Sequence, residues 1–388
     1  MISMKRIKVL HIIKTLSLGG AEMNLLNLIE ALDPDCFVSY VAYSAGGELE
    51  GRFINAGVKL FKFAEGEHKL KSFATFNIIW RLARFIRLNR IDIVHTHTFN
   101  AHIWGGIAAK FSGAKVIEHV HDSRYLERGD LIRRGDTNKQ YWAVYYLKNF
   151  SDFVVVLTKQ NVEFLTRHRL YPPSKVREVH NGIPLQFSRP IDAATVLALR
   201  DKFGIPRDAI VILSLVRFGP EKNIDLILRV APEVVDECPK AIFVIAGNGP
   251  LFETVKNEIK IRRLEDRIYL LGFQSDVQGL LILADIFLLP SFLELHSISI
   301  LEAMSRKIPV VVSRDVGCNN EFITDWENGI LLNPFSDEGW AEALVKLLKE
   351  PGLRQKIGEK GYETCAGKFN INNVARKIET LYTELSKR

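Results

Sequence analysis

Short apolar runs alternate with longer amphipathic stretches along the whole chain of 388 residues. This alternation is typical of parallel sheets that are covered by helices on both faces. The apolar runs are rich in Val, Ile and Leu without polar alternation, which predicts strands buried on both faces. The strands expected in the first half are residues 7–13, 37–43, 59–63, 92–97, 114–120 and 152–158. Those expected in the second half are residues 209–218, 241–247, 267–273, 286–291, 308–313 and 329–333.

Two sets of strands predict an α/β protein with two Rossmann-like domains, and the chain is too long for one ordinary domain. We place the boundary where Asn181-Gly182 and two prolines punctuate the chain, so the domains are expected at residues 1–184 and 185–370. The stretch 371–388 predicts a terminal helix, because its apolar residues recur at helical spacing. These residues are Ile371, Val374, Ile378, Leu381 and Leu385.

Composition and charge narrow the class of protein. The hydrophobic fraction of 47% and charged fraction of 25% are those of a soluble globular protein. The apolar run at the N-terminus is short and interrupted by Lys14, which favours a first strand over a signal peptide. The four scattered cysteines indicate a reducing compartment and no zinc site, so a cytoplasmic location is expected.

The net charge is concentrated in the first half. Residues 1–184 hold 26 Lys+Arg and 17 Asp+Glu, whereas residues 185–388 hold 26 and 28. A basic first half suggests an anionic partner, either a membrane surface, a phosphorylated acceptor or a nucleic acid. No nucleic-acid motif accompanies the charge, so we expect no nucleic-acid partner.

Two glutamates, Glu294 and Glu302, are the most informative feature of the second half. The first is expected in a loop after a strand and the second two helical turns further on, inside a helix. Such a pair can hold two ends of one ligand. The backbone N–H groups at the helix N-terminus between them suit a phosphate.

Arg217 and Lys222 bracket an expected turn between a strand and a helix. Open α/β sheets bind ligands at this edge, where the strands end. Fixed cations there would stabilise a departing diphosphate and could replace a metal ion.

The first half carries glycines and histidines at the ends of its strands. Gly19 and Gly20 open a helix without the GxGxxG pattern, so they are not a dinucleotide fingerprint. Two pairs of histidines, each spaced by two, lie on one face of two strands. They are His95 with His97, and His119 with His121. Zinc is one interpretation of two such pairs. We favour a role in a cleft, because no third ligand is spaced for zinc.

Taken together, these segments resemble glycosyltransferase family 4, the retaining enzymes of GT-B fold also called glycosyl transferases group 1. The resemblance covers nearly the whole chain and is strongest from about residue 210 to 335. It implies two Rossmann-like domains facing across a cleft, with the C-terminal helix crossing back to the first. It also implies metal-independent transfer of a sugar from a nucleotide-diphosphate sugar to a saccharide or lipid-linked saccharide. A UDP-sugar is favoured and a GDP-sugar is second.

The resemblance assigns roles to these residues. Glu294 would hold the donor sugar and Glu302 the ribose, while Arg217 and Lys222 would bind the diphosphate. In the first domain, Gly19 and Gly20 would meet the donor phosphates, His121 would donate a hydrogen bond near the sugar, and His97 would line the acceptor side. The catalytic set is expected to be His121, Arg217, Lys222 and Glu294, with no metal and no cofactor.

The chain departs from the family pattern after the first glutamate. Leu295 and His296 stand where the family usually has Gly. Some members carry His-Ser here, so His296, Ser297 and the backbone of Ile298 are expected at the donor phosphates. Sugar selectivity stays open.

Two basic segments belong to the expected acceptor side. Residues 68–90 contain a helix with Arg81, Arg84 and Arg87 on one side, and residues 124–148 add Arg124 and Arg128 among aromatic residues. Such segments suit peripheral docking on an anionic bilayer. A core helix with a solvated basic face explains the first segment equally well.

Two rival functions remain. A nucleotide-sugar 2-epimerase of similar fold would need further catalytic carboxylates, which we cannot place. A non-catalytic sugar-nucleotide-binding subunit is disfavoured by the intact set of Arg217, Lys222, Glu294 and Glu302.

Overall fold

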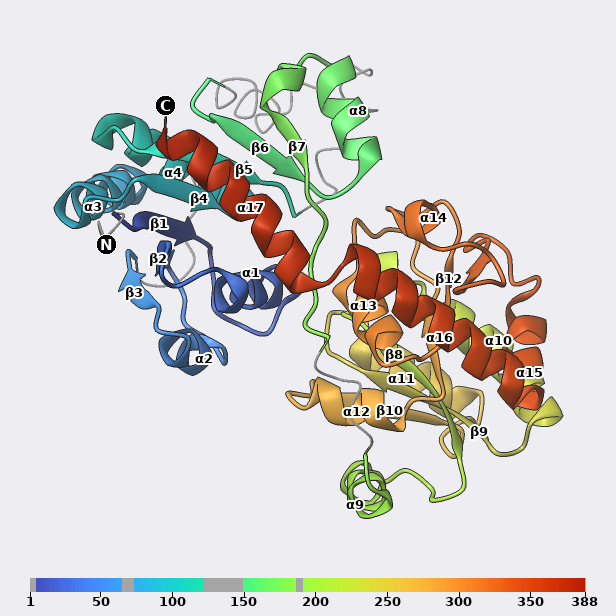
Figure 1. Ribbon diagram of the computed structural model, residues 1–388. Helices are drawn as coiled ribbons and strands as arrows, with labels where there is room; N and C mark the ends of the chain where they lie inside the picture. Colours follow the sequence, from blue (N-terminus) through green and yellow to red (C-terminus); the bar gives the residue numbers. More distant parts are fainter. Residues whose placement is uncertain (1–4, 65–72, 122–148, 186–190, 388) are drawn as a thin grey trace. The chain divides into compact units, whose positions relative to one another are not determined.

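The computed structural model divides the chain into two compact units. Unit 1 comprises Met1–Gly182 and Ile371–Arg388, and unit 2 comprises Ile183–Asn370 (Figure 1). The expected boundary at residue 184 lies two residues further along the chain. The structure describes residues 5–64, 73–121, 149–185 and 191–387.

The core of unit 1 is a sheet of seven parallel strands in the order β3-β2-β1-β4-β5-β6-β7. All six strands expected from the sequence are present. The seventh, β7, was missed because its three residues include Arg177 and Glu178 and form no apolar run. The strands are β1 (Ile7–Ile12), β2 (Phe37–Tyr43), β3 (Lys59–Lys62), β4 (Ile93–Thr96), β5 (Lys115–His119), β6 (Phe153–Val156) and β7 (Val176–Glu178).

Helices flank this sheet, and the last of them returns from the end of the chain. The helices are α1 (Gly20–Ala31), α2 (Glu50–Asn55), α3 (Phe73–Asn89), α4 (Phe99–Ser112), α8 (Lys159–Arg167) and α17 (Ile371–Ser386). All five apolar residues predicted on α17 are buried, and they pack with residues of β1, β4 and α1 (Figure 1). The prediction that the C-terminal helix packs on the first domain is therefore confirmed.

Unit 2 is built on six parallel strands in the order β10-β9-β8-β11-β12-β13, all of them expected. The strands are β8 (Ile210–Leu215), β9 (Ala241–Ala246), β10 (Ile268–Gly272), β11 (Ile286–Leu289), β12 (Val310–Ser313) and β13 (Ile330–Leu332). The helices are α9 (Ala193–Phe203), α10 (Ile224–Glu237), α11 (Phe252–Ile261), α12 (Val277–Leu283), α13 (Ile298–Ser305), α14 (Asn319–Phe322), α15 (Trp340–Lys349) and α16 (Pro351–Lys368).

The strand order reverses once in each sheet, between β1 and β4 in unit 1 and between β8 and β11 in unit 2. At such a switch point the two following loops leave in opposite directions, and ligands bind outside the carboxyl ends of the strands. Within the described residues, no helix is both long and apolar enough to cross a bilayer.

Candidate functional site

The loop after β8 lies against the loop after β9 at the switch point of unit 2. The backbone N–H of Phe218 donates to the carbonyl oxygen of Asn248 at 3.0 Å. Gly247 has a φ of +140°, and a Cβ atom there would lie 1.7 Å from the carbonyl oxygen of Val216. Only glycine permits this approach, so the Gly247 loop sets the backbone on which Arg217 stands. Arg217 itself is exposed.

Lys222 reaches the glutamate that the sequence singled out. It ends the short 3₁₀ helix η3 (Pro220–Lys222), and Asn223 follows with a left-handed φ of +51° that turns the chain into α10. The Nζ atom of Lys222 lies 2.7 Å from Oε1 of Glu294. Their side chains are only 19% and 11% exposed. A charge-assisted hydrogen bond therefore joins the loops after β8 and β11.

The loop that carries Glu294 is fixed from three sides. Ser291 Oγ donates to the same Oε1 atom at 2.8 Å, and the N–H of Phe292 donates to the carbonyl of Glu221 at 2.8 Å. Gly317 closes the third side, since a Cβ atom at its φ of +56° would lie 2.4 Å from the carbonyl oxygen of Leu295. The carboxylate is thus held in place before any ligand arrives.

Glu302 lies inside α13, as expected, with its side chain largely withdrawn from solvent. Burial raises the pKa of Glu302 to about 7, and the charge of Arg306 opposes this rise. The Arg306 guanidinium donates to Oε1 of Gln278 at 2.8 and 3.1 Å. A small change in its surroundings would therefore decide whether Glu302 is ionised near neutral pH.

The three residues expected at the donor phosphates are placed differently from one another. His296 is buried, with its ring 5.1 Å from that of Phe369 and 5.8 Å from that of Phe322. Ser297 caps α13, and Ile298 begins it. The first N–H groups of a helix have no acceptor within it, so the Ile298 end of α13 can receive an anion.

In unit 1, Gly19 precedes α1 and Gly20 begins it. Glu22 follows in the first turn and accepts a hydrogen bond of 2.9 Å from Thr15 Oγ1. A Cβ atom on Gly19 would lie 2.3 Å from the Glu22 carboxylate, which explains the glycine. Burial raises the pKa of Glu22, with the hydrogen bond from Thr15 acting in the opposite sense.

Five imidazoles lie together at the carboxyl edge of the same sheet. They belong to β1, to β4 and β5, and to the residues just after these strands. They are His11, His95, His97, His119 and His121. The sequence indicated four of them and missed His11, because it lies inside an apolar run and looks like a core residue.

Hydrogen bonds and ring contacts order this cluster. His97 lies between His11 and His121, with Nε2 3.1 Å from His11 Nδ1 and Nδ1 3.1 Å from His121 Nε2. His95 Nδ1 shares a hydrogen bond of 2.6 Å with the hydroxyl of Tyr382 on α17. The His119 ring stacks on the His121 ring at 4.0 Å between centroids.

Burial keeps the cluster neutral. It lowers the pKa of His11 to about 3 and the pKa of His95, His97 and His119 well below the usual value. A neutral imidazole has one N–H donor and one lone pair, so the cluster can hydrogen-bond or coordinate a metal. Two groups of three offer ligand atoms within 4.8 Å of one another: His11 with His95 and His97, and His97 with His119 and His121. The third ligand that the sequence lacked is thus available in space.

The structure brings together Lys222 with Glu294, and His97 with His121. Arg124 and Arg128, expected on the acceptor side, lie outside the described residues. Ser291 and Asn223 were missed. Both follow strand ends, and polar residues at that position were the available signal.

The depressed pKa values predict that unit 1 loses stability in mild acid. Between the folded pKa and the unfolded value of about 6.5, the unfolded chain binds more protons, so stability falls as the pH falls. Each buried histidine should contribute a slope of about 1.4 kcal/mol per pH unit below pH 6.5. Hydrogen exchange of the β1 and β4 amides, corrected for intrinsic rates, measures this opening free energy.

The variant His11→Gln should reduce that slope by one histidine, whereas His168→Gln, outside the cluster, should leave it unchanged. Glu118, whose pKa is raised by burial, acts in the opposite direction and makes the net slope smaller. An opening free energy that does not change between pH 7.5 and 5.5 would show that the cluster is not buried and neutral.

Comparison with known proteins identifies the class of this arrangement. The family model "Glycosyltransferase Family 4" matches residues 18–187, and "Glycosyl transferases group 1" matches residues 197–364. The alpha-D-kanosaminyltransferase of Streptomyces kanamyceticus is 28% identical over 81% of this chain and 83% of its own length. The UDP-Gal:alpha-D-GlcNAc-diphosphoundecaprenol alpha-1,3-galactosyltransferase of Escherichia coli is 25% identical over 98% of this chain and 97% of its own.

The fold has known counterparts as well. The crystal structure of Anabaena Alr3699/HepE in complex with UDP-glucose matches 97% of this chain and 100% of its own, with a TM-score of 0.83 and 18% identity. Both domains thus have the GT-B topology expected from the resemblance. The two family models together span both sheets and the edges on which the candidate residues lie. The chain belongs to glycosyltransferase family 4 and is a glycosyltransferase.

Proposed function

We propose that the protein is a retaining, metal-independent glycosyltransferase that takes its sugar from a nucleotide-diphosphate sugar. A UDP-sugar is the favoured donor and a GDP-sugar the second. The acceptor is a saccharide or a lipid-linked saccharide in cell-envelope polysaccharide synthesis, at the cytoplasmic face of the membrane. The observation that carries the proposal is the ion pair between Lys222 and Glu294 at the switch point of unit 2, beside the exposed Arg217.

The ion pair indicates how the donor would be held. Lys222 and Arg217 are the cations available to a diphosphate at this edge. When the diphosphate arrives, Lys222 exchanges the Glu294 carboxylate for a phosphate oxygen, which frees Glu294 to accept hydrogen bonds from sugar hydroxyls. Two cations that neutralise the leaving diphosphate supply the electrostatic stabilisation that a metal would otherwise give. The N-terminus of α13, with Ser297 and Ile298, adds backbone donors.

The remaining roles follow the family pattern. Glu302 would accept hydrogen bonds from the ribose. Gly19 and Gly20 would meet the phosphates, and His121 would donate to the donor sugar. The transfer would use front-face substitution, in which the acceptor oxygen bonds to the anomeric carbon as the diphosphate leaves and takes the acceptor's proton. This route needs no protein nucleophile.

The relatives support this choice of substrates. The Escherichia coli relative is named for a UDP-galactose donor and a diphosphoundecaprenol-linked acceptor. The Anabaena structure contains UDP-glucose. A 2-epimerase would turn over the donor without an acceptor, and a non-catalytic subunit would bind the donor without turnover, so both rivals are separable by assay.

The donor site predicts a thermal shift that needs no metal. In a panel of UDP-, GDP- and ADP-sugars, one donor should raise the melting temperature, and EDTA should not change the rise. The variant Lys222→Ala should abolish the shift and lower turnover roughly 10²- to 10³-fold, because one charge-stabilising group is lost. Lys202→Ala breaks a solvent-exposed ion pair with Asp276 in the same unit and should change neither. Unchanged turnover in Lys222→Ala would show that the diphosphate assignment is wrong.

The raised pKa of Glu302 predicts a pH dependence of donor binding. The ribose hydroxyls are held best by the ionised carboxylate, and both phosphates of the donor are esterified, so their charge is constant near neutrality. Below pH 7, donor affinity should fall by up to about tenfold per pH unit, as protons compete for Glu302. Calorimetry at pH 8, 7 and 6 measures this.

Glu302→Gln should bind donor weakly at every pH, with a flat profile. Glu258→Gln, on the outer surface of α11, is the control and should keep the slope of the unmodified protein. A flat profile in the unmodified protein would argue against Glu302 as the ribose ligand.

A docking face for an anionic bilayer is available on α3. The buried side matches the prediction, with Ile78, Leu82 and Ile86 in the core. The outer side carries residues spaced by four, which therefore share one face. Phe76, Trp80 and Leu88 are 75%, 54% and 71% exposed, and the Arg84 guanidinium lies 5.6 Å from the Trp80 ring centre.

Arginines surround this stripe, which makes it complementary to anionic lipid. Arg84 and Arg87 are exposed, and Arg87 donates to the carbonyl of Phe111, a ring that is 66% exposed. Each arginine near an anionic surface contributes about 1 kcal/mol, and aromatic side chains enter the headgroup layer. A membrane position would suit a lipid-linked acceptor.

Flotation with vesicles containing phosphatidylglycerol tests this face. The protein should bind at low salt, and the double variant Phe76→Ser/Trp80→Ser should bind roughly tenfold more weakly, since two apolar anchors are removed. Trp326→Ser removes an exposed tryptophan from unit 2 and should have no effect. If the unmodified protein ignores anionic vesicles at low salt, the docking proposal is wrong.

A further inference from the structure

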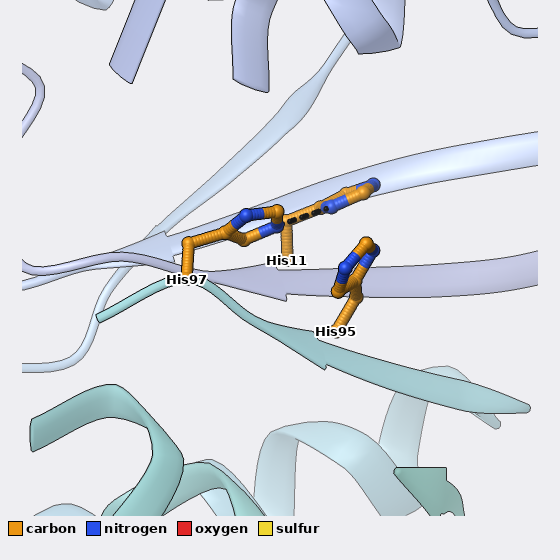
Figure 2. Close-up of side chains that lie close together, drawn as sticks. All are labelled: His11, His95 and His97. Carbon is orange, nitrogen blue, oxygen red and sulfur yellow. Dashed lines mark hydrogen bonds between the residues drawn. The ribbon is translucent and has the colours of Figure 1, made fainter. Parts of the chain in front are cut away.

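Three histidines form a hydrogen-bonded row that ends at the residue assigned to the donor sugar. His11 contributes Nδ1 from β1, His97 lies after β4 and bonds on both sides, and His121 receives the row at Nε2 after β5. Figure 2 shows the bond from His97 to His11 and the His95 ring beside them. The two N···N distances are both 3.1 Å, the normal length for a hydrogen bond.

The two hydrogen bonds must point in the same direction. A neutral imidazole carries one N–H and one lone pair, and burial keeps His97 neutral. His97 can therefore donate to one neighbour only, and it must accept from the other. Either His11 donates to His97 and His97 to His121, or the whole row is reversed. The protonated nitrogen of one end fixes that of the other.

The role of His121 selects one direction. His121 uses Nε2 within the row, so Nδ1 is the nitrogen left for a ligand. For Nδ1 to carry a proton and donate to a sugar hydroxyl, Nε2 must be a lone pair that accepts from His97. His97 Nε2 must then accept from His11. Donation by His121 is thus possible only when the row runs from His11 outward.

We propose that His11 and His97 are positioning residues, which hold His121 in the tautomer whose Nδ1–H donates to the donor sugar. The inference rests on the function proposed above for His121. It adds two residues that touch neither substrate, one of them in the middle of a core strand.

The buried end of the row favours the same direction. His11 Nε2 is fully buried and makes no hydrogen bond within the described residues. In the outward direction this atom is a bare lone pair, whereas in the reverse direction it is a bare N–H. Buried donors without partners are rarer in proteins than under-used acceptors. The bare lone pair is therefore the less costly end.

The neighbouring rings hold the row in place. His119 stacks on His121, and His95 lies 4.3 Å from His97 between ring centroids. Tyr382 anchors His95 through its hydroxyl. Rings packed in this way cannot turn over without opening the cluster, so the order of donors and acceptors persists.

A zinc ion on His11, His95 and His97 is the competing explanation, since their ligand atoms lie within 4.8 Å of one another. Zinc would take the lone pair of each ligand and leave no proton between His11 and His97. The hydrogen-bonded row and the zinc site are therefore mutually exclusive, and one measurement separates them.

That measurement is the nitrogen spectrum of the full chain with ¹⁵N-labelled histidine, prepared without a histidine tag. The ¹⁵N shift distinguishes a protonated from a bare ring nitrogen, and the spectrum of His121→Gln assigns His121. We expect His121 to be protonated at Nδ1 and bare at Nε2. Protonation at Nε2 overturns the proposal. So does stoichiometric zinc by metal analysis, with shifts that change when EDTA removes the metal.

Variants of the buried end separate positioning from packing. His11→Leu removes the donor, so the His121 signals should become a mixture of tautomers. The kcat should fall about tenfold, the loss typical when a group that orients an active residue is removed, with little change in the donor KM. His11→Asn can offer an amide N–H in place of Nδ1–H and should restore most of both. His119→Phe keeps a ring but removes the nitrogens, and should leave the His121 tautomer unchanged.

Equal kcat in His11→Leu and the unmodified protein would overturn the positioning role. So would equal losses in His11→Leu and His11→Asn, because packing alone would then explain them. The nitrogen spectrum needs no turnover. If no donor is turned over, the proposed function fails, while the direction of the row is still decided by the spectrum.

Discussion

The candidate sites depend on one constraint, the parallel direction of every strand in each sheet. Parallel strands end at a common edge, and the reversal of strand order opens that edge to a ligand. In unit 2 this brings Lys222 against Glu294, which lies 72 residues further along the chain. In unit 1 it brings together His11, His97 and His121, from three different strands. Topology, rather than local sequence, therefore assembles the chemistry in each unit.

The two glutamates of unit 2 have environments that suit different tasks. Glu294 faces a lysine and a serine hydroxyl, so its negative charge is matched before a ligand binds. Glu302 lies in a helix, and burial weakens its charged form. A partly buried ion pair costs desolvation, but exchange of one anion for another at Lys222 adds no new unpaired charge. The site can therefore change partners without a large electrostatic penalty.

The sequence was sufficient for the sheets and insufficient for the contacts between their edges. Twelve strands were predicted because burial on both faces demands Val, Ile and Leu, and β7 escaped because Val176–Glu178 is too short and too polar for that rule. Arg217, Lys222, Glu294 and Glu302 were found from their motifs. The environment of His296, between Phe322 and Phe369, depends on residues far along the chain and could not be predicted. His11 escaped for the opposite reason, since a buried strand hides a polar residue well.

Histidine is the side chain best suited to transmit a fixed direction through a buried row. A hydroxyl can rotate and serve as donor or acceptor toward either side, so a row of serines would hold no fixed order. A lysine or a carboxylate would bring a charge into the core at a high desolvation cost. A neutral imidazole has one donor and one acceptor on opposite sides of a rigid ring. Stacking of His119 on His121 and of His95 beside His97 prevents the rings from turning. The density of imidazoles at this edge thus has a physical reason: each ring in the row defines one hydrogen bond, and each ring around it keeps that bond from reversing.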